Sequence, residues 1–359
     1  MFVCTVKGSR GKALLLCAAL VCAAAAVLCY PQAAANGVRR GLALCGSVLI
    51  PSLLPFLVLS GFLVRSGLSD RIGRYFGRLT AFLFRLPGCC APAILIGFCG
   101  GYPAGAAAVA ELVRTGRLSA ADGRRMLLFC VNGGPAFVVN AVGVSLLGSR
   151  AHGWLLLGIH WGISLLLGIL SRFAAPKEEE RPSPPPSPLS GAAALADSVG
   201  TACRSLIGMC GFVMAASSAL FLTEAAGAPA RWLLPLSCLL EVNCGCVAAA
   251  AAGAAAPFWL GWSLGFGGLS VHGQIAACAP SLCPIDGRFF RTRLLHGFLS
   301  GLLSLWLWQY LPFSVSAFAT AGGFEALPAA ASWTGAASLL AIGAVSLIGL
   351  CRRSAARGA

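Results

Sequence analysis

The chain has 359 residues, of which 58% are hydrophobic and only 10% are charged, and its mean hydropathy is +0.84. Soluble domains carry about 25% charged residues, so this composition excludes an ordinary soluble protein and indicates a membrane protein. The formal net charge of +15 does not predict a nucleic-acid partner, because the Lys and Arg residues lie in short loops between apolar segments, as the positive-inside rule describes.

The apolar segments show no alternation of polar and apolar residues, which excludes a porin-like barrel and predicts an all-α fold, a polytopic membrane helical bundle. About 20 apolar residues cross a bilayer. The 17 cysteines include no C-x-x-C pair and no Cys/His cluster with metal-ligand spacing, so we expect no metal site and no cofactor. In chain order the apolar segments are 13–38, 41–64, 86–110, 126–149, 151–171, 205–223, 232–285, 294–324 and 326–351.

The first predicted unit is an N-terminal membrane helix within residues 1–40. Lys7, Arg10 and Lys12 precede its apolar run, and the alanines at 33–35 resemble a cleavage site, so a signal peptide is the alternative. We favour a retained helix because the apolar run is long for a signal peptide.

Two polar stretches interrupt the apolar segments. Within 66–85, Arg71, Arg74 and Arg78 recur at three- and four-residue spacing among apolar residues, which predicts an amphipathic helix in the membrane interface. Residues 174–190 are charged and then proline-rich. Such a stretch cannot bury a core, so we expect a cytoplasmic linker there.

The distribution of basic residues favours two re-entrant hairpins. If every segment crosses the membrane, the Lys and Arg residues divide poorly between its two sides. If 86–110 and 232–256 each enter and return on the same side, about eight crossing helices remain and the basic residues gather inside. Only four of the 26 Lys and Arg residues then lie outside: Arg39, Arg40, Arg150 and Arg231.

Each predicted hairpin contains residues that break a helix. Residues 100–105 read Gly-Gly-Tyr-Pro-Ala-Gly, and residues 243–245 read Asn-Cys-Gly. Broken backbone survives at membrane depth only where protein buries it or where it lines a wet cavity. A continuous helix with a proline kink is the alternative for each segment.

The two hairpins would open from opposite sides, so the two halves of the chain are predicted to be inverted repeats. This architecture is typical of secondary transporters, whose binding sites lie where the broken elements meet. We expect the first repeat at 41–173, the second at 191–312, and a C-terminal membrane helix with a basic tail at 313–359.

Glu241 is the acidic residue that lies well inside a long apolar run. A carboxylate at the bilayer centre costs at least ~2.5 kcal/mol, so its position predicts a function such as binding a solute or carrying a proton. The alternative places Glu241 near the outer interface, hydrated or paired with Arg231.

Asn132 begins the sequence Asn-Gly-Gly-Pro-Ala-Phe in the middle of the fourth apolar segment. Its amide offers both a donor and an acceptor, which suits a neutral hydrogen-bonding solute. The alternative is that the amide only binds a neighbouring helix.

Residues 265–274 form the matching element of the second half. Their glycines allow close approach of backbone or ligand, and His272 and Gln274 add polar side chains to an apolar run. An intramembrane protease with Ser270 as nucleophile and His296 as base is an alternative that neither spacing nor a supporting acid favours. The other histidines are interpreted as interfacial or packing residues: His152, His160 and His296.

Taken in order, the elements 100–106, 132–137, 240–245 and 267–274 resemble the sporulation integral membrane protein family (YlbJ type) of endospore-forming bacteria, over roughly 47–312. That family is grouped with the nucleoside recognition (Gate) domain, which resembles concentrative nucleoside transporters and the membrane part of ferrous iron transporters. Ala107 stands where that pattern has a lysine, and Cys244 replaces a polar residue.

The resemblance implies a multi-pass protein of the cytoplasmic membrane of a spore-forming bacterium, with two Gate-like repeats and a permease-like core. The alternative is a non-transporting scaffold for spore cortex or envelope assembly. We expect no enzymatic activity and no nucleic-acid partner, and we expect the lipid bilayer and a small polar solute as partners, with a homodimer left open. The candidate substrate-binding residues are Gly101, Tyr102, Pro103, Gly105, Asn132, Pro135, Glu241, Asn243, Gly268, His272 and Gln274.

Overall fold

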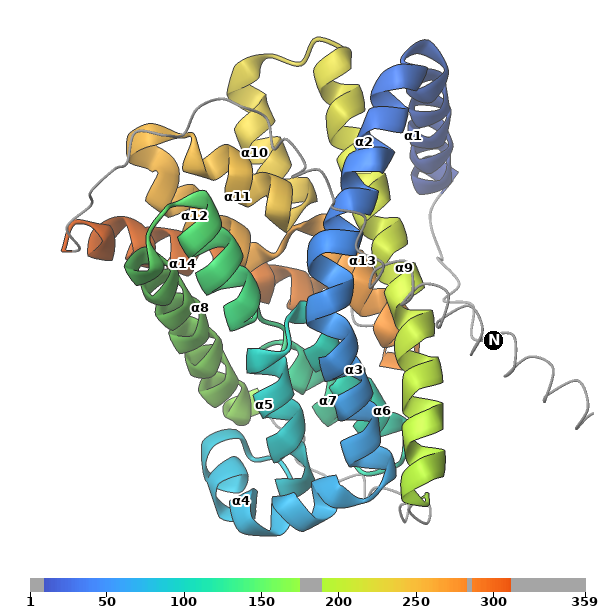
Figure 1. The fold of residues 1–359 in the computed structure, drawn as a ribbon, viewed down its shortest axis with the longest axis vertical. Coiled ribbons are helices and arrows are strands. Elements are labelled where there is room, and N and C mark those ends of the chain that lie inside the picture. Colours follow the sequence, from blue (N-terminus) through green and yellow to red (C-terminus); the bar gives the residue numbers. More distant parts are fainter. Residues whose placement is uncertain (1–9, 175–188, 283–285, 311–359) are drawn as a thin grey trace, which may run out of the picture.

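The computed structural model describes residues 10–174, 189–282 and 286–310 (Figure 1). All regular elements in these ranges are helices, so the predicted all-α class is confirmed. The predicted C-terminal unit and most of the predicted linker lie outside the described residues. The main helices are α1 (Arg10–Cys29), α2 (Pro31–Leu44), α3 (Ile50–Arg65), α4 (Leu68–Phe84), α5 (Ala91–Cys99), α6 (Tyr102–Arg114), α7 (Ala120–Leu127), α8 (Arg150–Ser171), α9 (Gly191–Ala225), α10 (Ala230–Leu240), α11 (Val242–Ala250), α12 (Ala256–Phe266), α13 (Gly268–Cys278) and α14 (Gly287–Trp308).

Two helices in the described part of the chain are long and apolar enough to cross a membrane alone, Arg150–Ala174 and Gly191–Ala225. The number rises to four if two bent pairs each count as one span: Cys17–Cys29 with Pro31–Ser47, and Leu53–Arg65 with Leu68–Phe84. Breaks at glycine and proline divide several of the other apolar segments into shorter helices, so the number of crossings stays a prediction.

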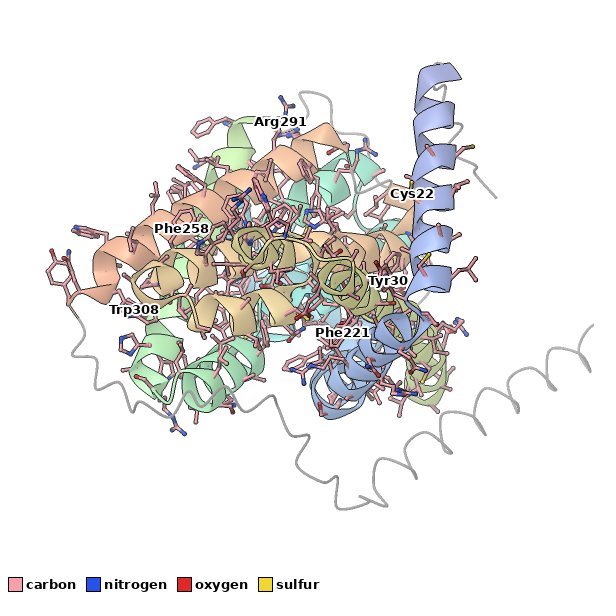
Figure 2. All side chains as sticks on the ribbon, turned by 90° about the horizontal axis from the view of Figure 1, so that it is seen from above. Cys22, Tyr30, Phe221, Phe258, Arg291 and Trp308 are labelled. Atoms are coloured by element: carbon pink, nitrogen blue, oxygen red, sulfur yellow. The ribbon has the colours of Figure 1, made fainter. Side chains whose placement is uncertain are left out.

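The boundary between the first two helices differs from the predicted one. The charge pattern places it at Arg39 and Arg40, between the apolar segments 13–38 and 41–64. Arg39 and Arg40 lie inside α2, and the chain bends by 98° between α1 and α2. Pro31 explains the position, because proline is unfavourable inside a helix but fits well at the first position of a new one. From Cys17 to Cys29 α1 is exposed except at Ala26, and it stands apart from the bundle (Figure 2).

The amphipathic helix predicted within 66–85 is found as α4. It begins after Gly67, whose φ of 73° is left-handed, and it runs at 86° to α3. Its exposed side chains include Arg74 and Tyr75, the latter 87% exposed. A polar and aromatic face on a helix turned across the span is typical of a membrane interface.

Both predicted hairpins fold back on themselves. Eight residues of continuous helix span about 12 Å, yet a Cβ atom on Gly105 of α6 would lie 2.7 Å from the Cα of Gly97 on α5. A Cβ on Gly245 of α11 would likewise lie 2.7 Å from the Cα of Cys238 on α10. The alternative of a kinked continuous helix is therefore wrong for both segments.

Each hairpin is followed by a second break. Residues 128–134 interrupt the helical run between α7 and the π-helical segment η3 (Ala136–Leu146). Gly267 and Gly268, with φ of 85° and 76°, separate α12 from α13. Only glycine adopts this left-handed backbone without strain, which explains the glycine pair. Three of the four breaks line one pocket, and the fourth, at Gly267 and Gly268, packs against the turn at Glu241.

Candidate functional site

A pocket of about 70 Å³ lies where the breaks converge, large enough for several water molecules or a small polar solute. Its walls come from η1 (Cys45–Leu49), α3, the turn between α5 and α6, the segment before η3, the turn between α10 and α11, and α13. The lining residues are Leu49, Leu53, Phe56, Cys99, Gly100, Gly101, Tyr102, Pro103, Gly133, Gly134, Ala136, Phe137, Glu241, Val242, Asn243, Val271 and Gln274.

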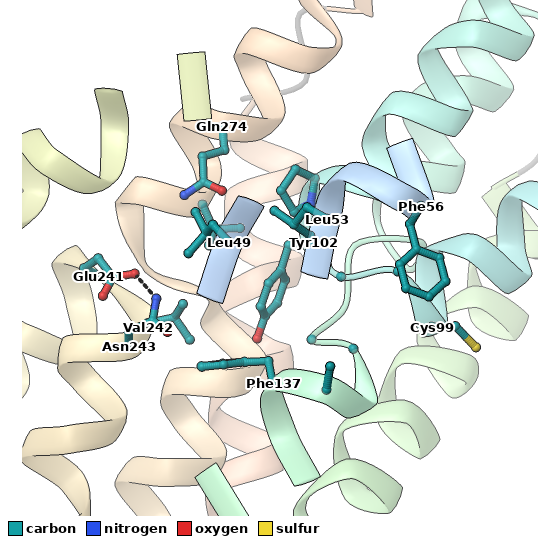
Figure 3. Close-up of a pocket in the computed structure, with 17 residues that line it drawn as sticks. Leu49, Leu53, Phe56, Cys99, Tyr102, Phe137, Glu241, Val242, Asn243 and Gln274 are labelled. Atoms are coloured by element: carbon teal, nitrogen blue, oxygen red, sulfur yellow. Dashed lines mark hydrogen bonds between the residues drawn. The ribbon is translucent and has the colours of Figure 1, made fainter. Parts of the chain in front are cut away.

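The pocket is polar at one end and apolar at the other (Figure 3). The side chains of Glu241, Asn243 and Gln274 lie on one side of Tyr102, and Phe56 lies on the other. A solute bound here would present its hydrogen-bonding groups to the first side and its carbon skeleton to the second. Ligand pockets commonly combine an apolar lining with a few placed polar groups in this way.

Glu241 occupies the turn between α10 and α11 and is fully buried. One carboxylate oxygen accepts the N–H of Cys244 at 2.8 Å, and the other accepts the amide N–H of Asn243 at 2.7 Å. The carboxylate therefore caps α11, where the positive end of the helix dipole stabilises it. No ion pair joins Glu241 to Arg231 within the described residues, so the interfacial alternative has no support from the contacts.

Tyr102 connects the first hairpin to the second half of the chain. Its hydroxyl donates a hydrogen bond to the carbonyl oxygen of Leu264 on α12 at 2.8 Å. The guanidinium of Arg293 lies over its ring, 5.9 Å from the ring centre. Both contacts are buried, so Tyr102 is both a wall of the pocket and a link between the halves.

We expect Tyr102→Phe to lower stability by about 1 kcal/mol, because the Leu264 carbonyl loses its donor in a buried place. The melting temperature of the purified protein in detergent measures this change. Tyr75→Phe is the control, because Tyr75 is 87% exposed. Equal melting temperatures for the two variants would mean that the Tyr102 hydroxyl carries no structural bond.

The breaks touch one another in pairs. A Cβ on Gly134 would lie 2.6 Å from the carbonyl oxygen of Cys99 and 3.2 Å from the amide nitrogen of Gly101. A Cβ on Gly268 would lie 3.0 Å from the amide nitrogen of Glu241. In each half the second break therefore packs backbone to backbone against the hairpin turn, which a larger residue would prevent.

Five of the predicted site residues do not line the pocket. Gly105 packs against the carbonyl of Cys130, and Pro135 is the N-cap of η3. The Asn132 amide donates to the carbonyl of Phe129 at 2.8 Å, so it binds the local backbone. His272 packs against Phe289 of α14, and Gly268 packs against Glu241.

His272 faces an aromatic cluster. Its Nδ1 donates to the carbonyl of Gly268 at 2.7 Å, and its ring contacts Phe266 and Phe289 at 4.8 and 5.3 Å between ring centres. Ser270 accepts a hydrogen bond from the Gln274 amide at 3.1 Å. His296 instead contacts Arg293, so the Ser/His pair that a protease needs is not assembled.

A buried cation near the pocket was missed by sequence analysis. Arg293 on α14 is fully buried and donates to the carbonyls of Val131 and Phe266, at 2.9 and 3.4 Å. Val131 lies within the first glycine break, two residues before Gly133, and Phe266 immediately precedes the second at Gly267. Arg293 sits at the start of an apolar segment, where a basic residue is ordinary, so no sequence signal distinguishes it from a flanking charge.

Two histidines complete this buried cluster. The rings of His160 and His296 stack with their centres 4.7 Å apart. His160 Nε2 accepts the N–H of Gly133 at 2.9 Å, and His296 Nε2 donates to the His160 carbonyl at 3.1 Å. The cluster therefore satisfies backbone groups that the glycine break frees. Sequence analysis expected these histidines only to pack, and it did not predict that they form hydrogen bonds with the backbone.

A second buried network lies at the end of α3. Arg65 pairs with Glu111 of α6 at 2.9 Å and with Asp197 of α9 at 3.2 Å, and Glu111 also pairs with Arg114 at 2.6 Å. The network joins the first hairpin to the two helices beside it. In the part of the chain that the structure describes, no group of three or more His, Cys, Asp or Glu side chains could hold a metal ion.

Comparison with known proteins agrees with these elements. Residues 47–150, which contain the first hairpin and the first glycine break, match the family model described as nucleoside recognition, Gate. The chain is 26% identical over 344 residues, covering 84% of each chain, to the sporulation integral membrane protein YlbJ of Bacillus subtilis (strain 168). No solved structure matches the chain. The resemblance expected from the motifs is confirmed, and the chain is a membrane protein that is similar to YlbJ along most of its length and carries a nucleoside recognition (Gate) match.

Proposed function

We propose that this chain is a permease-like protein of the cytoplasmic membrane of a spore-forming bacterium, and that it moves a small polar solute during spore formation. The observation that carries the proposal is the pocket between the two hairpin turns, with a buried carboxylate and two amides at one end. Broken backbone at membrane depth is expected where it lines a solute pathway. The sporulation role comes from the similarity to YlbJ.

We further propose that residues 41–173 and 191–312 are inverted repeats. Each contains a hairpin followed by a broken helix, and in each a glycine of the break packs on the hairpin turn. A long helix closes each unit: α8 follows the first break and α14 the second, both with 22 residues. Two units of like construction around one pocket support an alternating-access mechanism.

Glu241→Gln tests the proposal. The glutamine keeps the size of the side chain and one acceptor for the α11 cap, but it cannot carry a charge or a proton. We expect normal protein abundance and a loss of sporulation in a host that lacks its own copy. Glu224→Gln is the matched control, because Glu224 is an exposed acid at the end of α9. Normal sporulation of the Glu241 variant would contradict the proposed role.

Accessibility of Cys99 separates transport from a scaffold. Cys99 lines the pocket, so a membrane-impermeant thiol reagent can report when the pocket opens, in a variant whose other cysteines are replaced. A transporter must open to each side in turn, so labelling from both faces supports transport. Labelling from one face only, in a variant that still sporulates, favours a scaffold.

A further inference from the structure

A second pocket lies at the end of α8, away from the site described above. Its volume is about 140 Å³. It lies between α7, the start of α14 and Ala174, which is the last residue of the candidate span Arg150–Ala174. Unlike the first pocket it is predominantly polar. Its lining residues are Ala121, Arg124, Arg125, Leu128, Ala174, Asp286, Arg288 and Phe289.

Two of its arginines have charges that no described residue compensates. Arg125 is 2% exposed and pairs with Asp122 at 2.8 Å, so its charge is used within the fold. Arg124 and Arg288 are exposed, and their guanidinium groups make no hydrogen bond or ion pair with the described residues. Two free guanidinium groups from different helices at one polar cavity are the usual means of binding a phosphate.

The acid in this pocket defines the ligand further. One oxygen of Asp286 accepts the N–H of Phe289 at 2.6 Å as the cap of α14. A carboxylate has four acceptor positions, so Asp286 can still accept a hydrogen bond from a ligand. The pocket therefore matches a phosphate that carries a hydroxyl or ammonium donor on the same molecule, because such a group would reach Asp286 while the phosphate binds the arginines.

The pocket also lies at one end of a candidate membrane span, where lipid headgroups are expected. The candidate membrane span Arg150–Ala174 ends at a residue of the pocket wall. Beside it the guanidinium of Arg172 lies between the exposed rings of Phe82 and Phe173, at 5.6 and 5.8 Å from their centres. Aromatic and basic side chains together mark the interface, and basic pockets at the cytoplasmic ends of spans bind anionic headgroups.

We propose that this pocket binds the phosphate of a phosphodiester headgroup that bears a hydrogen-bond donor. Arg124 and Arg288 hold the phosphate oxygens, and Asp286 accepts from the headgroup's hydroxyl or ammonium. Such a ligand would join α7 to α14, the helices that lead into the first glycine break and the Arg293 cluster. The proposal does not depend on transport.

The test uses the full-length protein, purified in detergent and stripped of lipid. Native mass spectrometry and melting temperature are measured with phosphatidylglycerol, phosphatidylethanolamine, phosphatidylcholine and inorganic phosphate. We expect the first two lipids to bind and stabilise, and phosphatidylcholine, which lacks a donor for Asp286, to bind more weakly. Stabilisation by inorganic phosphate equal to that by the lipids would assign the site to free phosphate and overturn the headgroup assignment.

The variants test the residues. The double variant Arg124→Gln with Arg288→Gln is expected to weaken lipid binding about tenfold or more. Each lost charge-assisted hydrogen bond raises the dissociation constant several-fold. Arg291→Gln is the control, because Arg291 lies three residues further along α14 at the outer surface (Figure 2) and does not line the pocket. An unchanged affinity in the double variant, or an equal loss in the control, would overturn the proposal.

Discussion

Gly105→Ala is expected to cost about 3 kcal/mol or more and to lower the yield of folded protein sharply. A Cβ at this position would overlap the carbonyl oxygen of Cys130 and approach the Cα of Gly97. Both neighbours are backbone, so no side chain can rotate away to make room. The two arms of the first hairpin would have to separate, and the pocket wall at Tyr102 would move with them.

The measurement is the melting temperature of the purified protein together with its yield from membranes. Gly158→Ala on α8 is the matched control, because a Cβ there meets nothing within 4 Å. In a helix alanine is favoured over glycine by about 1 kcal/mol, so the control should be unchanged or more stable. If Gly105→Ala melts like the control, the close approach of α5 and α6 is wrong.

The second large effect is expected at the buried network of α3. Glu111→Gln removes the carboxylate that pairs with Arg65. The Arg65 side chain is only 3% exposed, so water cannot replace that partner. Breaking a buried ion pair from one side costs about 3 to 5 kcal/mol. Asp197 and the hydroxyls of Ser198 and Thr201 still contact Arg65, so we expect a loss toward the lower end of that range.

A double variant separates the ion pair from simple packing. Arg65→Met with Glu111→Leu removes both charges and fills the space with apolar atoms, so it should be more stable than Glu111→Gln alone. Arg114→Gln is the control, since the Arg114 side chain is 59% exposed and its bond to Glu111 is screened by water. Equal melting temperatures for Glu111→Gln and Arg114→Gln would contradict a buried pair at Arg65.

The breaks could be predicted from the sequence because glycine and proline act locally. Pro103 and the glycines at 100–101 together favour a break in the helix, and the basic residues on either side favour a return of the chain to the same side. The same reasoning placed the second break at residues 243–245, but these lie inside α11 and the chain turns at Glu241 instead. The sequence did not give the number of spans. Whether a bend such as that between α3 and α4 lies inside the bilayer or at its surface depends on the depth at which each helix end lies.

The candidate site was predicted in part for a related reason. Tyr102, Glu241 and Gln274 were found because polar residues beside breaks in apolar runs are uncommon. Asn132 has the same signal, yet its amide binds a carbonyl one turn away, and only the direction of the side chain distinguishes the two cases. Arg293 had no signal, since its burial results from α14 packing across both breaks.

The paired glycine contacts also constrain how the molecule can move. Gly134 holds one break against its hairpin and Gly268 holds the other, in both cases with main chain on main chain. Such contacts have no rotamers to exchange, so each hairpin and its broken helix form one rigid body. The two bodies are joined by hydrogen bonds from the side chains of Tyr102 and Arg293 to carbonyl oxygens. These side chains can break a bond to one carbonyl and form a bond to another. We therefore expect the easiest relative motion to be a sliding of one body past the other along this seam, with the geometry inside each hairpin unchanged.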